Sequence, residues 1–327
     1  MTAETTAAPA APPLAKKRSR TLREFLTRNP VLLKELRGRM RGARAFVVLT
    51  LNLVLMSGFV MLIYTVYAAA ANAPYGGTNR QMIGKFVFYG VVGMELLIVC
   101  FLAPAFTVGA ISGERERQTF DLLRTTLLSA RALVFGKLTS ALSYVLLLLL
   151  AGLPLQSLAF LLGGVAPEEV IISTVMLITT AFLFCSAGLF FSSLMRRTLG
   201  ANILTYAFAL LDTLGLPILL LAALPIFGFM SYGYGYGSPP RLLVQLLFAY
   251  GLGALISVNP VATAIMTEVF LVDKHTVFYF TLPFTTSSGS TFDAPFVSPW
   301  IVFTAFGLVL GALFVFLSIS LVRRAER

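Results

Sequence analysis

The chain has 327 residues, of which 57% are hydrophobic and only 12% are charged, and its formal net charge is +11. A soluble globular domain carries about 25% charged residues, so this composition excludes a soluble enzyme, a disordered chain and a fibrous protein. We therefore expect a polytopic membrane protein. Basic residues collect in the cytoplasmic loops of such proteins, so the positive net charge does not indicate a nucleic-acid partner.

The N-terminal region divides into two segments. Residues 1–20 are rich in alanine, threonine and proline and lack the apolar run of a secretory signal, which predicts a disordered cytoplasmic tail. Residues 21–44 predict an interfacial amphipathic helix, with Asn29 as N-cap and Pro30 as first residue. Its apolar positions recur at helical spacing: Leu32, Leu33, Leu36 and Met40. We expect it to lie in the lipid headgroup plane; the alternative is a solvated basic linker.

Six apolar runs follow, each long enough to cross a hydrocarbon core about 30 Å thick. They cover residues 45–71, 87–111, 138–162, 170–194, 201–230 and 300–322. Their residues do not alternate with the period of two that a barrel strand requires. The sequence therefore predicts an all-α polytopic membrane protein with a six-span transmembrane domain at residues 45–322.

The 25 lysine and arginine residues divide unequally between the two sides of these spans. One side holds 21 of them, including those of the basic tail 323–327, and the other side holds Arg80, Lys85, Arg241 and Lys274. By the positive-inside rule the richer side is cytoplasmic. We expect a multi-pass protein of the cell (inner or plasma) membrane with both termini in the cytoplasm.

Residues 231–299, before the last span, are expected on the outer side. Residues 242–257 within them are apolar, but at 16 residues they are short for a span, which favours a re-entrant or interfacial segment. The rest of this outer region is rich in glycine, serine, threonine and proline and predicts loop.

The cytoplasmic loop 112–137 predicts a helix at residues 114–128. Glu114 and Glu116 fall in its expected first turn, where carboxylates favour the helix dipole. Phe120, Leu123 and Leu127 form an apolar stripe on one face. Such a stripe requires a partner, and lipid, the same chain and another protein are all open alternatives.

The motif in this loop resembles the ABC-2 type permease family, the membrane subunits of ATP-binding-cassette exporters. The similar stretches are ERERQTFDLLRTTLLS with the later Gly136-Lys137, and NPVLLKELRGRMR at residues 29–41. Gln118 and Leu127 depart from the family pattern, in which glycine and proline are common at these positions.

The resemblance implies that the loop helix is a coupling helix docking into a separate soluble ATPase, which binds the ATP and Mg. Its implied ATPase contacts are Glu114, Glu116, Phe120, Leu123, Arg124 and Leu127. Helix-in-groove docking suits an apolar stripe flanked by charge. A second permease copy, or a related permease, is the other implied partner, beside membrane lipid.

Catalytic and metal-binding patterns are not found in the sequence. The phosphate-binding pattern G-x-x-x-x-G-K-[ST] does not occur. The single histidine, His275, and the two cysteines, Cys100 and Cys185, are too few and too scattered for a zinc site. We therefore expect a non-enzymatic chain with no catalytic residue, metal site or cofactor of its own.

Two acidic residues, Glu95 and Asp212, fall inside predicted spans. An acidic residue at the centre of a bilayer costs about 2.5–3.5 kcal/mol on insertion scales. Such residues face a bundle interior or a water-filled cavity, so both are candidates for a translocation path. The alternatives are that Glu95 reaches the outer interface and that Asp212 is protonated or hydrogen-bonded between helices.

The function predicted for the chain is the permease subunit of an ABC exporter with an unknown substrate. One alternative is an ion-coupled secondary transporter, which would show inverted repeats and ion ligands at the midplane. A second is a membrane enzyme, which requires a cluster of acidic and histidine residues. The third is a non-transporting scaffold or assembly factor.

Overall fold

The computed structural model describes residues 43–71, 80–119, 129–215, 217–218, 221, 242–274, 276–285 and 290–325. The predicted tail 1–20 and residues 21–42 of the predicted interfacial helix lie outside these ranges, as do residues 222–241.

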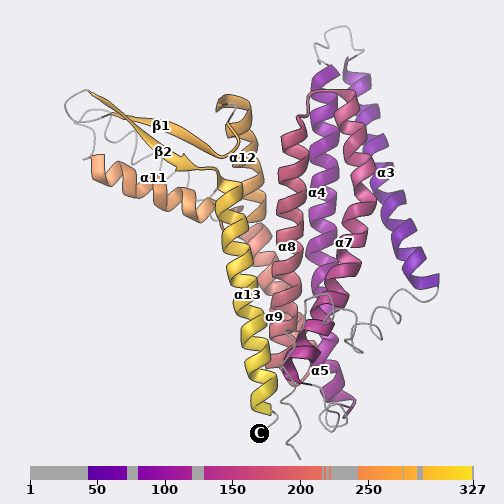
Figure 1. Cartoon of the computed structure of the whole chain (residues 1–327). Coiled ribbons are helices and arrows are strands. Elements are labelled where there is room, and N and C mark those ends of the chain that lie inside the picture. Colours follow the sequence, from indigo (N-terminus) through magenta and orange to yellow (C-terminus); the bar gives the residue numbers. More distant parts are fainter. Residues whose placement is uncertain are drawn as a thin grey trace, which may run out of the picture.

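Five long helices form a bundle (Figure 1). They are α3 (Ala43–Ala71), α4 (Arg80–Thr107), α7 (Ala130–Leu162), α8 (Pro167–Leu194) and α13 (Pro299–Ala325). All are apolar around their circumference, and each contains a stretch long and apolar enough to cross a membrane. This finding confirms helices at five of the predicted spans, 45–71, 87–111, 138–162, 170–194 and 300–322.

The second span is longer than predicted. After Thr107, α4 continues into α5 (Gly109–Glu116), and the two together form one apolar stretch from Met82 to Glu116. Figure 1 shows α5 at the same end of the bundle as the last residues of α13. We call this end the α5 end and the opposite one the hairpin end.

The predicted span 201–230 is described only in its first half. It begins as α9 (Thr198–Leu210) and passes into a π-helical turn, η1 (Leu211–Gly215). A π-turn is a widening of the helix that often marks a functional position. The predicted count of six spans is therefore supported for five helices, with 217–218 and 221 the only described residues of the remainder of this segment.

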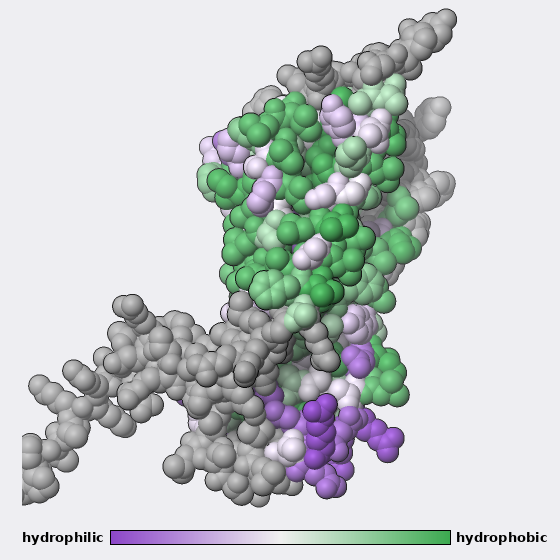
Figure 2. Space-filling view, turned by 90° about the vertical axis from the view of Figure 1, so that its right-hand side faces the viewer, coloured by the Kyte–Doolittle hydropathy of each residue, from purple (hydrophilic) through white to green (hydrophobic). Residues whose placement is uncertain are grey.

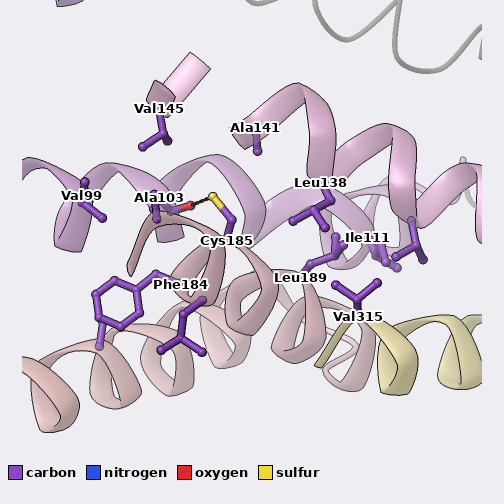
Figure 3. Close-up of a cluster of buried hydrophobic side chains, with 14 of the residues drawn as sticks. Val99, Ala103, Ile111, Leu138, Ala141, Val145, Phe184, Cys185, Leu189 and Val315 are labelled. Atoms are coloured by element: carbon purple, nitrogen blue, oxygen red, sulfur yellow. Dashed lines mark hydrogen bonds between the residues drawn. The ribbon is translucent and has the colours of Figure 1, made fainter. Parts of the chain in front are cut away.

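Helix α8 lies at the centre of the bundle and contacts α4, α7, α9 and α13. Its Phe184, Cys185 and Leu189 are fully buried against residues of α4, α7 and α13 (Figure 3). Small residues bring the helices close: a Cβ added at Gly307 or Gly311 of α13 would clash with side chains of α8. Helices α4, α7, α9 and α13 therefore all pack against α8.

The region between η1 and α13 differs from the predicted outer loop. It contains α11 (Leu242–Ile256), α12 (Pro260–Lys274) and an antiparallel hairpin of β1 (Tyr279–Thr285) and β2 (Thr291–Val297). Helices α11 and α12 meet at a bend of 120°, a geometry of broken spans and re-entrant loops. Figure 1 shows α11 projecting sideways from the bundle, with the hairpin beside it.

The prediction of loop was wrong at α12, β1 and β2. Asn259 caps α12 by accepting a hydrogen bond from the Ala262 backbone N–H at 2.7 Å, and Pro260 takes the first helical position. In the hairpin, Phe280 lies opposite Phe296, and each strand alternates apolar and polar residues. Pro283 and Pro295 interrupt that alternation in the sequence, and for this reason the sequence predicts loop at the two strands.

The surface of the bundle is strongly apolar. Large hydrophobic side chains are exposed along its helices, among them Leu51 and Val54 of α3 and Phe101 of α4. Figure 2 shows a broad hydrophobic band on one face, with hydrophilic residues gathered toward the α5 end. A surface of this kind matches the hydrocarbon core of a bilayer, so the chain is a multi-pass membrane protein.

Candidate functional site

The α5 end carries the start of the predicted coupling segment, but the helix there ends earlier than predicted. Helix α5 ends at Glu116, and Gln118 adopts the left-handed conformation with φ of 56°. The Thr119 N–H donates to the Glu114 carbonyl at 3.0 Å and the Gln118 N–H to the Arg115 carbonyl at 3.1 Å. These two bonds form a Schellman C-cap, which terminates the helix.

A continuous helix over 114–128 is therefore wrong. Glu114 and Glu116 belong to the last turn of α5, not to the first turn of a separate helix. The other predicted contacts, Phe120, Leu123, Arg124 and Leu127, lie outside the described residues. The sequence could not show this break because glycine, the usual residue at a left-handed C-cap, is replaced by glutamine here.

An ion pair joins α5 to α7. The Lys137 Nζ lies 2.6 Å from Glu114 Oε1, and the exposed fractions of the two side chains are 5% and 23%. Burial makes this pair consequential, because removing one partner leaves a charge in a site of low polarity. Gly136-Lys137, noted above only as part of a motif, thus brings its lysine to the end of α5.

Glu116 joins α5 to α9. It accepts a hydrogen bond from the Thr198 backbone N–H at 2.8 Å, and the Thr198 hydroxyl donates to its other carboxylate oxygen. Thr198 is the first residue of α9, whose own N-cap residue Arg197 makes no side-chain cap. The carboxylate of one helix therefore caps the positive end of another.

Two further contacts tie α5 to the end of α8. The Arg115 guanidinium donates to the Ser193 carbonyl at 3.0 Å. The hydroxyl of Ser192 accepts hydrogen bonds from the backbone N–H groups of Ile111 and Ser112, each at 3.0 Å. Helix α5 is therefore bonded to α7, α8 and α9 at once. We call this set of contacts the α5 brace.

The two intramembrane acids lie in different places. Glu95 of α4 is 2% exposed and accepts a hydrogen bond from Gln156 Nε2 of α7 at 2.6 Å. Asp212 lies in η1, where its carbonyl oxygen accepts a hydrogen bond from the Asn259 side-chain amide. Asn259 precedes α12, so η1 is held by the α11–α12 bend. Glu95 thus connects α4 with α7, whereas Asp212 connects η1 with the residue that precedes α12.

A polar cluster at the hairpin end was missed by the sequence analysis, which treated Lys85 only as a charge to be counted. Lys85 and Tyr89 of α4 meet Glu169 of α8 and Glu268 of α12. The two glutamates are 84 and 183 positions away from Lys85 along the chain, so no local pattern could have paired them with it. The available signal was the rarity of acidic residues in so apolar a sequence.

Within the ranges that the structure describes, no group of three or more His, Cys, Asp or Glu side chains is arranged to hold a metal ion.

These features define a multi-pass membrane protein with a polar brace at one end of its bundle. Comparison with known families then shows which class it is: the family described as ABC-2 family transporter protein matches residues 30–324. The chain belongs to this family, whose members are non-enzymatic membrane components that normally work with an ATPase subunit. No curated protein matches the chain.

Proposed function

We propose that the chain is the permease subunit of an ABC exporter, in which a separate soluble ATPase binds ATP and Mg and drives movement of a substrate. The α5 end and both termini would face the cytoplasm, and the hairpin end would face the outside. The protein would reside in the cell (inner or plasma) membrane. Family membership and the excess of basic residues near the termini support this orientation.

The α5 brace is the observation that carries the proposal. The segment 117–129 connects α5 to α7, and both of its ends are anchored: one by Glu114 and Glu116, the other by Ser129 as the N-cap of α7. A force applied to this segment by a closing ATPase would act on α5, α7, α8 and α9 together. Tilting of these helices would open a path for the substrate between two permease copies.

In this proposal the expected ATPase contacts have two different roles, docking to the ATPase and bonding within the chain. Phe120, Leu123, Arg124 and Leu127 form the docking face in the proposal, since an apolar stripe suits a groove in a partner. Glu114 and Glu116 act chiefly through their bonds within the chain. Glu95 and Asp212 remain candidates for residues that influence the path, each through the interhelical contact described above.

The proposal is tested by co-purification. The full chain with an affinity tag is isolated from membranes of its own cells, and a bound Walker-motif ATPase is identified and its vanadate-sensitive ATP hydrolysis measured. Leu123→Asp places a charge on the predicted stripe, whereas Thr125→Asp, two positions along, places the same charge outside that stripe and is the matched control. We expect ATPase to be lost with Leu123→Asp alone.

Retention of the ATPase by Leu123→Asp, in protein that still inserts into the membrane, would contradict docking through this segment. Transport assays address the alternatives. Family membership argues against an ion-coupled secondary transporter, which would work from an ion gradient without ATP. A scaffold would bind the ATPase without any ATP-dependent transport in vesicles.

A further inference from the structure

A small cavity lies at the hairpin end between α4, α8 and α12. Its volume is about 80 Å³, which is room for several water molecules or a small headgroup. Most of its wall is apolar and includes Phe88, Leu96, Ile172, Met176 and Leu271. The polar part of the lining comes from the hydroxyl residues Tyr89, Ser173, Thr180 and Thr267 and from two carboxylates, Glu169 and Glu268.

The positive charge of Lys85 is divided unequally between these carboxylates. Lys85 Nζ lies 2.8 Å from Glu268 Oε1 but 3.8 Å from Glu169 Oε1. Glu268 Oε1 also accepts a hydrogen bond from the Tyr89 hydroxyl at 2.7 Å. Glu268 is therefore well compensated. Glu169 has a distant share of one ammonium group, a backbone hydrogen bond with Ala166 and a place in the first turn of α8, and no cation lies close to it among the described residues.

Glu169 is also deeply buried. Its side chain is 8% exposed, and in the described part of the chain Oε2 has no hydrogen-bond partner. Thr267, 3% exposed, likewise has a hydroxyl for which the described residues supply no partner. Buried polar atoms of native proteins are normally hydrogen-bonded, and a buried charge without a partner is costly. The described residues hold eleven such atoms, and these two belong to residues that line the same cavity, so one ligand bound there would satisfy both.

We propose that this cavity binds an organic monocation with an apolar body. Its ammonium group donates to Glu169 Oε2 and Thr267 Oγ1, and its apolar part lies against the wall formed by Phe88 and Ile172. With one lysine and two glutamates the cluster has a formal charge of −1, so a monocation neutralises it. The aromatic ring of Phe88 adds a favourable surface for a cation.

The lining favours an organic cation over a metal ion. Calcium takes six to eight oxygen ligands and magnesium about six, whereas this cavity offers two unpartnered oxygen atoms in an apolar wall. An ammonium group with an apolar substituent needs only a few acceptors and gains from the hydrophobic wall. This proposal concerns binding alone and goes beyond the transport function proposed above.

The test uses the purified full chain in lipid nanodiscs and the fluorescence of its single tryptophan, Trp300. Trp300 packs against the cluster formed by Ile172, Met176 and Phe303, two of which line the cavity. The probe is phenethylamine, and 2-phenylethanol is its neutral counterpart with the same apolar body. We expect a saturable fluorescence change with the amine and only a linear, partition-like change with the alcohol.

Variants assign the effect to the cavity. Glu169→Gln is expected to weaken phenethylamine binding about tenfold or more, because it removes the charge opposite the ammonium group. Glu168→Gln is the matched control, since the neighbouring Glu168 is exposed and does not line the cavity. Thr267→Val should weaken binding less, and it keeps the volume of the side chain. A variant counts as folded when its elution volume and its helical content equal those of the unsubstituted chain.

Four results would overturn the proposal. They are the absence of a saturable change in the unsubstituted chain, an equal response to 2-phenylethanol, an equal response to sodium chloride alone, and unchanged affinity in folded Glu169→Gln and Thr267→Val. Because these measurements involve neither ATP nor an ATPase, failure here leaves the exporter proposal standing, and loss of ATPase docking leaves this one standing.

Discussion

Both ends of the bundle hold charged side chains between helices, but the ion pairs at the two ends differ in how closely the charges approach each other. At the α5 end, Lys137 meets Glu114 at 2.6 Å, and Glu116 binds the first residue of α9. At the hairpin end, two glutamates share Lys85, whose Nζ lies 2.8 Å from Glu268 but 3.8 Å from Glu169. One carboxylate oxygen of Glu114 and one of Glu169 lack a hydrogen-bond partner within the described structure, so the two ends differ in the closeness of their ion pairs. Removing one partner of a close, buried ion pair costs more than removing one partner of a distant pair. The comparison therefore separates a closely paired end from a loosely paired one.

The largest expected effect comes from breaking the α5 brace. Lys137→Met should lower the free energy of unfolding by about 3 kcal/mol, because it leaves the carboxylate of Glu114 partly buried without its cation. Unfolding in mixed micelles measures this loss. Arg131→Met, at an exposed position of the same helix, is the control and should have little effect. Recovery of stability in the double variant with Glu114→Gln is also expected; a Lys137→Met protein as stable as the control would refute the brace.

The second prediction concerns the support of the hairpin end. Asn259 is buried, caps α12 through its carbonyl oxygen, and donates through its amide to the carbonyls of Asp212 and Thr213. Asn259→Ala should cost about 2 kcal/mol of stability. Asn259→Asp keeps the capping oxygen and removes the amide donor, so the two variants separate capping of α12 from the grip on η1. Equal stability of both variants and the unsubstituted chain would show that the α11–α12 bend is held by other contacts.

The third prediction is that removing a charge at the hairpin end stabilises the protein, whereas removing one at the α5 end destabilises it. Glu169→Gln should not destabilise the ligand-free protein and should raise its free energy of unfolding by about 1 kcal/mol, because it removes an undercompensated buried charge. The measurement is the same unfolding experiment, with Glu168→Gln as reference. A loss of stability as large as that of Lys137→Met would mean that the two ends are built alike, and the comparison would fail.

The fourth prediction is the smallest. Gln118→Gly should raise the free energy of unfolding by less than about 1 kcal/mol, because glycine adopts the left-handed C-cap conformation without the steric penalty of a side chain. Gln118→Ala keeps a side chain at the same backbone angle and is the control. A stabilisation by alanine as large as that by glycine would show that the conformation at this position is not the cause.

The spans were predictable because lipid imposes a strong condition on sequence: about 20 consecutive apolar residues, with basic residues outside. Five of the runs identified in this way are helices in the structure. The condition is weaker for the region before α13, where short elements pack on one another. The sequence predicts loop at α12 and the hairpin, because Pro283, Pro295 and the serine-rich sequence 287–290 obscure the periodicity of the strands.

The candidate site was predictable only in its location. The charged motif pointed to the segment after the second span, but the partners of Glu114 and Glu116 are 23 and 82 residues away. The two glutamates that contact Lys85 are 84 and 183 residues away from it along the chain. Pairings of this kind depend on how helices pack, which a single sequence does not reveal.

The central claim is that the α5 end meets a cytoplasmic ATPase while the hairpin end faces outward. Labelling of intact cells with a membrane-impermeant maleimide tests it directly, using Thr119→Cys at the α5 end and Thr291→Cys in the hairpin, both exposed positions. The unsubstituted chain is the background control, since Cys100 and Cys185 are buried. The account predicts that the cysteine at 291 is labelled in intact cells and the one at 119 only after permeabilisation. Labelling of the cysteine at 119 in intact cells would contradict it.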